Sequence, residues 1–209
     1  MLIKNLVVGH LSTNCYIVTD EATMKSVIID PGAESNSILE YVESNGMTVE
    51  AILITHGHFD HTTGAPNLQE ELNVPIYIHK RDTYSSGPHD HVRFAIKDGA
   101  NVIFYAEGDT VTVGGLTFTV IETPGHSQGS VTLKIEDVLF TGDTLFRDSV
   151  GRTDLDGGDM RVLLDSLLKL YDLEGEYEVF PGHMESTTLD RERRFNYYMN
   201  YANRELREE

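Results

Sequence analysis

The spacing of hydrophobic and polar positions predicts strands that alternate with helices in the first half of the chain. Apolar or alternating runs bounded by turn residues are typical of strands, and apolar positions three or four residues apart are typical of an amphipathic helix. Strands are expected over Leu2–Val8, Cys15–Thr19, Ser26–Asp30, Ala51–Thr55 and Pro75–His79, and helices over Glu34–Ser44, with Ser35 as a cap, and near Thr63–Leu72.

The second half of the chain is richer in strands. They are expected over Thr110–Val113, Leu116–Glu122, Ser130–Ile135, Val138–Thr141 and Glu178–Phe180. The pair Gly114-Gly115 predicts a tight hairpin between the first two. Helices are expected over Met160–Tyr171 and Leu189–Arg204, and Tyr84–Ala100 is expected to be a loop near or over the functional site.

Both halves supply strands and then helices, and no linker or low-complexity segment divides them. We therefore expect an α/β fold in which two sheets pack face to face with helices outside. The 209 residues and the 40% hydrophobic content suit one globular domain over residues 1–209 with a substantial core.

The charge balance is strongly acidic, with a formal net charge of −18 from 34 acidic and 16 basic residues. An acidic surface argues against nucleic acids and anionic membranes as partners. No segment approaches the roughly 18 consecutive apolar residues of a membrane helix, and the N-terminus lacks a signal-peptide pattern. Cys15 is the only cysteine, so no intramolecular disulfide can form. A cytoplasmic location is expected, because a lone cysteine fits a reducing compartment.

Residues 55–61 form the most informative motif of the chain, Thr-His-Gly-His-Phe-Asp-His. Four potential ligands, His56, His58, Asp60 and His61, follow an apolar run that is predicted to be a buried strand. Imidazole and carboxylate are the ligands of zinc and of its borderline neighbours. Four such groups clustered after a buried strand would be unfavourable without a cation. The motif therefore predicts a metal site.

Three later segments have the same form, an apolar run that ends in a glycine turn and a ligand. They end in Pro124-Gly125-His126, Gly142-Asp143 and Pro181-Gly182-His183. Ligands at strand ends are held rigidly, and the neighbouring glycine lets the backbone approach an ion closely. Together with the first motif they give seven candidate ligands, which are His56, His58, Asp60, His61, His126, Asp143 and His183.

Seven ligands are too many for one tetrahedral zinc ion and suit two divalent metals that share a bridging carboxylate and a bridging water. Residues two apart on an extended segment share a side, which groups His56 with His58. The two expected ligand sets are His56, His58 and His126, and Asp60, His61 and His183. Asp143 would bridge them. Zinc is the expected metal, with iron or manganese as alternatives, and any part that Asp60 or Asp143 takes in catalytic proton transfer is secondary to ligation.

These motifs, in this order, resemble those of the metallo-β-lactamase superfamily over nearly the whole chain. The resemblance implies a four-layer αββα sandwich with the metals at one edge of the two sheets. Asp30, in Ile28-Ile29-Asp30-Pro31-Gly32, matches the superfamily's first motif. By this resemblance Asp30 orients a ligand, which is a role that metal sites generally require.

Within the superfamily, the segments 142–146, 151–154 and 181–183 resemble the short, single-domain bacterial branch of the glyoxalase II group. Those enzymes hydrolyse S-acyl thioesters such as S-lactoylglutathione. The chain departs from them at Met184-Glu185, where that branch usually has Gly-Pro. It also lacks a separate C-terminal helical domain for glutathione, and Gly151-Arg152-Thr153-Asp154 replaces a segment that contacts glutathione in the longer enzymes. The thiol carrier is left open.

Three residues are candidate substrate contacts. Arg147 and Arg152 follow the Asp143 loop and would meet a carboxylate of the thiol moiety. Tyr84 is the third, at the start of the expected loop. The alternative for Arg152 is a structural salt bridge with an acidic neighbour.

The expected reaction is attack of a metal-activated water on the carbonyl carbon of a small-molecule thioester. A thiolate leaves unprotonated more easily than an amine, because a free thiol has a pKa of roughly 8.5. The closest alternative is a persulfide dioxygenase of the same superfamily, with one iron in a facial triad of His58, His126 and Asp143. Another is a lactone or β-lactam hydrolase on the same scaffold. A non-enzymatic scaffold is disfavoured because all seven ligands are present.

Overall fold

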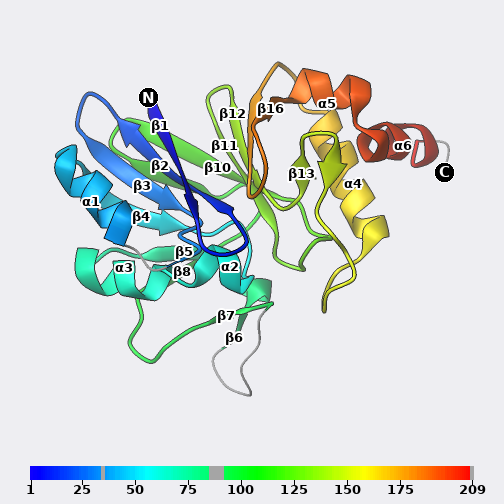
Figure 1. Ribbon diagram of the computed structural model, residues 1–209. Coiled ribbons are helices and arrows are strands. Elements are labelled where there is room, and N and C mark those ends of the chain that lie inside the picture. Colours follow the sequence, from blue (N-terminus) through cyan, green and yellow to red (C-terminus); the bar gives the residue numbers. More distant parts are fainter. Residues whose placement is uncertain (34–35, 85–91, 208–209) are drawn as a thin grey trace.

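The structure is a computed structural model and describes residues 1–33, 36–84 and 92–207. It is built around two six-stranded sheets (Figure 1). The first sheet contains, in order across it, β1 (Leu2–Val8), β2 (Thr13–Asp20), β3 (Lys25–Ile29), β4 (Thr48–Leu53), β5 (Ile76–His79) and β8 (Val102–Tyr105). Strands β1 to β3 are antiparallel neighbours, and β3, β4, β5 and β8 run parallel to one another.

The second sheet has the strand order β16-β15-β12-β11-β10-β9. Its strands are β9 (Thr110–Val113), β10 (Leu116–Glu122), β11 (Val131–Ile135), β12 (Val138–Gly142), β15 (Glu178–Pro181) and β16 (Thr187–Thr188). Strands β9 to β12 pair antiparallel, and β15 joins β12 in parallel. Strands β10, β12 and β15 therefore run in one direction, and their carboxyl ends lie along the same edge of the sheet.

Helices cover the outer face of each sheet, which gives four layers (Figure 1). The helices α1 (Asn36–Ser44) and α3 (Ala65–Leu72) pack on the first sheet, and α4 (Met160–Tyr171) and α6 (Tyr197–Glu205) pack on the second. The shorter elements are α2 (Phe59–Thr62), a 3-10 turn (Lys80–Asp82), β6 (Thr83–Tyr84), β7 (Phe94–Ala95), β13 (Leu145–Phe146), β14 (Ser149–Val150) and α5 (Leu189–Phe195). The expected αββα sandwich is confirmed. Within the described ranges, every helix is too short or too polar to cross a bilayer.

The central strands are apolar at successive positions because they are buried on both faces. Along β2, Tyr16 and Val18 face the second sheet, whereas Ile17 packs with the α1 and α3 side chains. Along β12, Phe140 faces the first sheet and Leu139 faces α4 and α6. Successive side chains of a strand point to opposite faces, so a strand between two layers needs an apolar residue at nearly every position.

The structure corrects the prediction of one helix over Leu189–Arg204. Two helices, α5 and α6, meet at Asn196, whose backbone is extended (φ −68°, ψ 120°). The Asn196 side-chain oxygen accepts hydrogen bonds from the amides of Tyr198 and Met199 and so caps α6. Asparagine starts a new helix in this way because its side-chain oxygen accepts from the free amides of the first turn.

Other elements differ in their extent. The strand expected over Ala51–Thr55 is β4, which begins at Thr48 and ends at Leu53. Strand β8 has no predicted counterpart, and it lies at the edge of the first sheet, where Ile103 and Phe104 are exposed. The segment Tyr84–Ala100, expected to be a loop, contains strand β7 and the last residue of β6, and these two short strands pair in parallel. Residues 85–91 and the expected cap Ser35 lie outside the described residues.

Candidate metal centre

The seven candidate ligands come from loops at one edge of the sandwich. His56 and His58 lie in the loop after β4, and Asp60 and His61 lie in α2, which follows at once. The remaining three follow strands of the second sheet and are His126 after β10, Asp143 after β12 and His183 after β15. Because β10, β12 and β15 share a direction, their ends bring these three residues to the same edge. The first motif meets them there from the other sheet.

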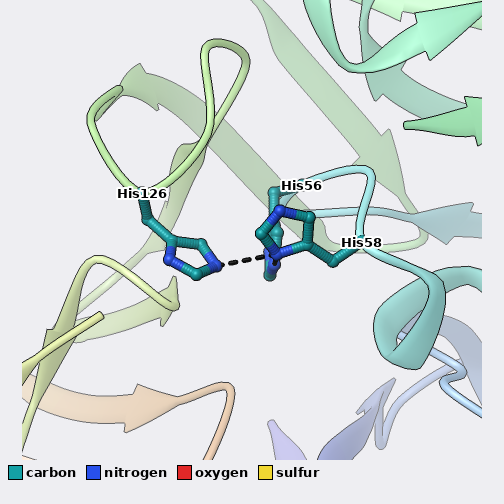
Figure 2. A group of neighbouring side chains, drawn as sticks. All are labelled: His56, His58 and His126. Atoms are coloured by element: carbon teal, nitrogen blue, oxygen red, sulfur yellow. Dashed lines mark hydrogen bonds between the residues drawn. The ribbon is translucent and has the colours of Figure 1, made fainter. Parts of the chain in front are cut away.

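The first set of ligands is the group His56, His58 and His126 (Figure 2). The His58 Nδ1 atom lies 3.0 Å from His56 Nε2 and 2.8 Å from His126 Nε2. Figure 2 shows His126 reaching from its own loop toward the other two rings. All three side chains are buried. The predicted grouping of these histidines is present in the geometry.

Outer hydrogen bonds orient two of these rings. The His126 Nδ1–H donates to the backbone carbonyl of Arg152 at 2.7 Å, which leaves its Nε2 lone pair directed at the centre. The Thr55 hydroxyl donates to Asp30 at 2.5 Å, so its oxygen is left to accept from His56 Nδ1 at 3.2 Å. The proton of His56 is therefore on Nδ1, and the Nε2 atom directs its lone pair at the centre. Such outer partners fix the tautomer of a metal-binding imidazole.

The second set is the group Asp60, His61 and His183. The Asp60 Oδ2 atom lies 3.2 Å from His183 Nε2 and 3.6 Å from His61 Nε2, and the two imidazole nitrogens are 3.4 Å apart. On its far side, His61 Nδ1 lies 2.9 Å from Asp30 Oδ2. Asp30 thus orients His61 directly and His56 through Thr55, which is the geometry expected of a ligand-orienting residue.

Asp143 lies between the two sets. Its Oδ1 is 3.4 Å from His61 Nε2, and its Oδ2 is 3.5 Å from both His126 Nε2 and His183 Nε2. The same carboxylate therefore faces one histidine of the first set and two of the second. This is the position that a bridging ligand requires.

The site holds neutral imidazoles on one side and charged groups on the other. Burial lowers the pKa of His58 to about 4, with His126 and His61 adding to the effect. Burial and the neighbouring His61 also hold the pKa of His56 well below its ordinary value. In the second set, burial opposes the charge of His61, but Asp143 and Asp30 outweigh it and raise the His61 pKa. At neutral pH His56 and His58 thus present uncharged nitrogen donors.

The carboxylates are held in their ionised form. Burial alone would raise the pKa of Asp143, but the charge of His61 outweighs burial and lowers it. The pKa of Asp60 is lowered against burial by its hydrogen bond with His183 and by the charge of His61. In this arrangement protonated imidazoles supply the positive charge that the buried carboxylates need, and a divalent cation would compete with those protons.

These residues fit a divalent metal centre. Zinc–nitrogen and zinc–oxygen bonds of about 2.0–2.2 Å would place the ligand atoms of one ion about 3–3.5 Å apart. The separations given above for the two sets run from 2.8 to 3.6 Å, and all ligand atoms within a set lie within 4.8 Å of one another. Asp143 Oδ1 is buried and has no hydrogen-bond partner among the described residues, and a buried anionic oxygen without one needs a cation.

Two glycines allow the ligand loops to approach this closely. A Cβ atom on Gly182 would lie 2.3 Å from Asp143 Oδ1 and 2.6 Å from His61 Cε1. Gly142 has a φ of +49°, and a Cβ there would lie 2.4 Å from Thr55 Oγ1. The glycine turns before Asp143 and His183 are therefore required by the space around the ligands and not only by the turns themselves.

Asp82 is a site residue that the sequence motifs do not reveal. Its carboxylate, 1% exposed, accepts hydrogen bonds from Gly57 N at 2.8 Å, Gly129 N at 2.6 Å and the Ser127 hydroxyl at 2.5 Å. It thereby ties the turn between His56 and His58 to the loop that follows His126. The only signal in the sequence is an acidic residue shortly after the predicted strand that ends at His79.

The three candidate substrate contacts have different surroundings. The Arg147 guanidinium pairs with Glu185 at 2.6 Å. The Arg152 guanidinium is held by Asp154 through two bonds of 2.6 and 2.7 Å, which is the salt bridge considered as the alternative for this residue. Tyr84 lines a neighbouring hollow with Phe59. Among them Arg152 lines the cavity at the metal centre.

A cavity of about 520 Å³ opens in front of the ligands. Its described lining consists of Leu11, His58, Phe59, Asp60, Val92, His126, Asp143, Phe146, Arg152, Leu155, His183 and Met184. Five of the seven candidate ligands line this opening, and they are His58, Asp60, His126, Asp143 and His183. The volume is in the range typical of sites for small organic molecules.

Comparison with known families gives one match that covers most of the chain. The family model described as "Metallo-beta-lactamase superfamily" matches residues 8–183. Among curated proteins, hydroxyacylglutathione hydrolase GloC of Haemophilus influenzae is 30% identical over 210 residues, which cover 96% of this chain and 99% of GloC.

Solved structures show the same fold. The BLEG-1 B3 metallo-beta-lactamase superposes with a TM-score of 0.85 at 32% identity, over 95% of this chain and 99% of that protein. ETHE1 from Myxococcus xanthus has a TM-score of 0.82 at 30% identity, over 98% of this chain and 91% of that one. TTHA1623, solved in a di-iron-bound form, has a TM-score of 0.78 at 34% identity, over 93% of this chain and 99% of that one.

Proposed function

The chain belongs to the metallo-β-lactamase superfamily, and from this premise we propose that it is a hydrolase with two divalent metal ions that cleaves S-acyl thioesters. The observation that carries the proposal is the position of Asp143, 3.4 Å from His61 and 3.5 Å from His126. A carboxylate between two sets of three ligands suits a dinuclear centre better than a single ion. The structure of TTHA1623 in a di-iron-bound form supports two metals on this scaffold.

Each residue has a part in the proposed centre. His56, His58 and His126 would hold one ion, Asp60, His61 and His183 the other, and Asp143 would join them. Zinc is the proposed metal, and iron and manganese accept the same donors. Two bound ions supply a water of lowered pKa and positive charge beside a substrate carbonyl oxygen. The Asp30 carboxylate keeps the ligand nitrogens of His56 and His61 directed inward.

The thioester is favoured by the nature of the cavity's titratable groups. Every histidine and carboxylate of the described lining is a proposed ligand, and Arg152 is the remaining ionisable residue there. The described lining therefore offers no spare acid to protonate a leaving group. A thiolate needs none, because a thiol pKa of roughly 8.5 makes it a stable leaving group near neutral pH. The similarity to a hydroxyacylglutathione hydrolase points the same way.

A second candidate function is oxidation of a persulfide by a single iron. Its support is a possible facial triad, since the His58 and His126 nitrogens are 2.8 Å apart and Asp143 Oδ2 lies 3.5 Å from His126. Two histidines and one carboxylate suit non-haem iron. In that case no ion would be bound by the second set, which is Asp60, His61 and His183. The spacing of these three ligands nevertheless fits a metal ion.

Metal analysis and turnover on the same preparation test the proposal. The protein is reconstituted with zinc, iron or manganese and assayed on S-lactoylglutathione, a simple lactone and a β-lactam, with thiol release followed by a thiol reagent. We expect two metal ions per chain and release of a thiol and a carboxylic acid. One iron per chain with oxygen uptake on glutathione persulfide would favour the second candidate. Cleavage of the lactone or the β-lactam alone would assign a different hydrolase.

A further inference from the structure

The cavity at the metal centre has an apolar rim. Leu11, Phe59 and Met184 line it, and they expose 54%, 46% and 60% of their surfaces. Large apolar side chains grouped around an opening are unfavourable in water and mark a surface that a ligand covers. The lining continues inward with the apolar residues Val92, Phe146 and Leu155. The wall around the ligands is therefore predominantly hydrocarbon.

Met184 is held at this rim in a strained conformation. Its φ is +68°, in the left-handed region that is unfavourable for a residue other than glycine. The Asn14 side chain fixes it there by donating to the Met184 carbonyl at 2.9 Å. The hydrogen bond from strand β2 therefore holds this conformation, which keeps the exposed Met184 side chain beside His183, at the mouth of the cavity.

The cavity lacks an unpaired cation in its described lining. Arg152 is the one basic side chain there besides the histidines. Its guanidinium is held at two points by Asp154, at 2.6 and 2.7 Å. Arg147, the next arginine toward the Asp143 loop, is paired with Glu185. A carboxylate on a substrate would have to displace one of these acidic partners before it met a free guanidinium.

We propose that this cavity selects thioesters whose thiol carrier is apolar and uncharged over those whose carrier bears carboxylates, such as glutathione. This inference rests on the proposed thioesterase function. The carrier would lie against Leu11, Phe59 and Met184, with the carbonyl at the metal centre. In the reaction water adds its oxygen to the carbonyl carbon and the carbon–sulfur bond breaks. The carbonyl fragment leaves as a carboxylate, the carrier as a thiolate, and two protons pass to solvent.

A matched series of thioesters tests the selection. The same lactoyl group is joined to glutathione, to glutathione diethyl ester and to benzyl mercaptan, so that the first two differ only in their masked carboxylates. We expect kcat/KM on the diethyl ester and on the benzyl thioester to exceed that on the glutathione thioester by about tenfold or more, mainly through KM. Equal or greater kcat/KM on the glutathione thioester overturns this inference and leaves the thioesterase proposal standing. No turnover of any of the three by metal-loaded protein overturns both.

Two variants link the selection to named side chains. Asp154→Asn frees the Arg152 guanidinium, so we expect KM for the glutathione thioester to fall several-fold while the benzyl thioester is unaffected. Met184→Gln keeps the length of the side chain but makes it polar, and we expect kcat/KM on the benzyl thioester to fall about tenfold with the glutathione thioester little changed. Met160→Gln is the matched control, because Met160 is exposed at the start of α4 and does not line the cavity. An equal effect of Met184→Gln on both substrates, or no effect, contradicts the assignment.

Discussion

The Asp82 carboxylate accepts a hydrogen bond from the backbone amide of Gly57 at 2.8 Å, in the turn that separates His56 from His58. Its other oxygen accepts from Gly129 at 2.6 Å, three residues beyond His126. One buried carboxylate thus holds the two loops that carry the first ligand set. We therefore expect the spacing of the three imidazoles to depend on a residue outside the ligand set.

Replacing Asp82 with asparagine should therefore weaken metal binding. Both Asp82 oxygens accept hydrogen bonds. The asparagine side chain has one oxygen that can still accept, but its NH2 group would face a backbone N–H or a hydroxyl that now donates. Loss of such an outer partner typically lowers metal affinity by about 10- to 100-fold. Competition with a chelator measures it, and we expect the ion of the first set to be lost at lower chelator concentration. Asp109→Asn is the control, since Asp109 accepts from Ala106 in a turn far along the chain from the ligands. Equal affinity in D82N and wild type would show that the loops hold their spacing without Asp82.

Replacing a proposed ligand should remove metal and turnover together. His58→Ala deletes the nitrogen that lies 2.8 and 3.0 Å from the other two of its set, and Asp143→Ala deletes the proposed bridge. We expect fewer than two metal ions per chain in each and a loss of kcat of about 100-fold or more. His79→Ala is the matched control, because His79 is also buried but pairs with Glu122 outside the ligand sets. Hydrolysis at the wild-type rate by a metal-free variant would refute the proposed centre.

Adding one methyl group at Gly182 should disturb the second ligand set. The new Cβ would lie 2.3 Å from Asp143 Oδ1, so either the carboxylate or the strand end must move. We expect Gly182→Ala to lower the free energy of unfolding by about 1–3 kcal/mol and to reduce metal content. Gly115→Ala is the control, since its Cβ would stay 3.4 Å from the nearest atom. Denaturant unfolding and elemental analysis measure both effects, and similar results for the two variants would contradict the prediction.

The metal-free protein should lose stability in mild acid through His58. Burial lowers the pKa of His58 to about 4 in the folded state, while the unfolded value is about 6.5. The folded state therefore binds fewer protons, so this contribution to stability is full above pH 6.5 and is lost as the pH falls toward 4. A shift of this size corresponds to about 3 kcal/mol.

The variant His58→Gln isolates this contribution. It carries no titrating group at position 58, so its free energy of unfolding should fall less between pH 6.5 and 4 than that of the wild type. Urea unfolding of chelator-treated protein at several pH values measures the difference. His61 acts in a separate window, because its raised pKa gives stability that is full below pH 6.5 and lost as the pH rises. Parallel pH profiles for wild type and H58Q would show that His58 is not held neutral by the fold.

The candidate ligands that the structure brings together could be found from the sequence because each stands in a recognisable local pattern. His56 and His58 are two apart on an extended segment, and His126, Asp143 and His183 each follow a strand and a glycine turn. The direction of β10, β12 and β15 then brings the last three to one edge of the sheet. The bounds predicted for the helix Met160–Tyr171 match α4, because its apolar positions have clear helical spacing.

Other features could not be predicted because they depend on contacts between distant residues. Asp82 acts through Gly57 and Gly129, which lie 25 and 47 residues away. Arg152 orients His126 through its backbone carbonyl, to which side-chain chemistry gives no clue. The break between α5 and α6 lies at Asn196, whose side-chain amide donates hydrogen bonds to the Ser149 carbonyl and the Glu192 carboxylate. The spacing of apolar residues gives no sign of these contacts.

The order of the ligands along the chain has a consequence for how the protein is made. The first set is complete once residue 126 has left the ribosome, but the second needs His183, which follows β15, the last parallel strand to join its sheet. A growing chain can therefore bind at most one ion in the proposed geometry until His183 has been synthesised and β15 has paired with β12. In the proposed centre, loading of the second ion would follow synthesis of β15, and a chain cut short before β15 would keep its histidine trio but lack the second ligand set.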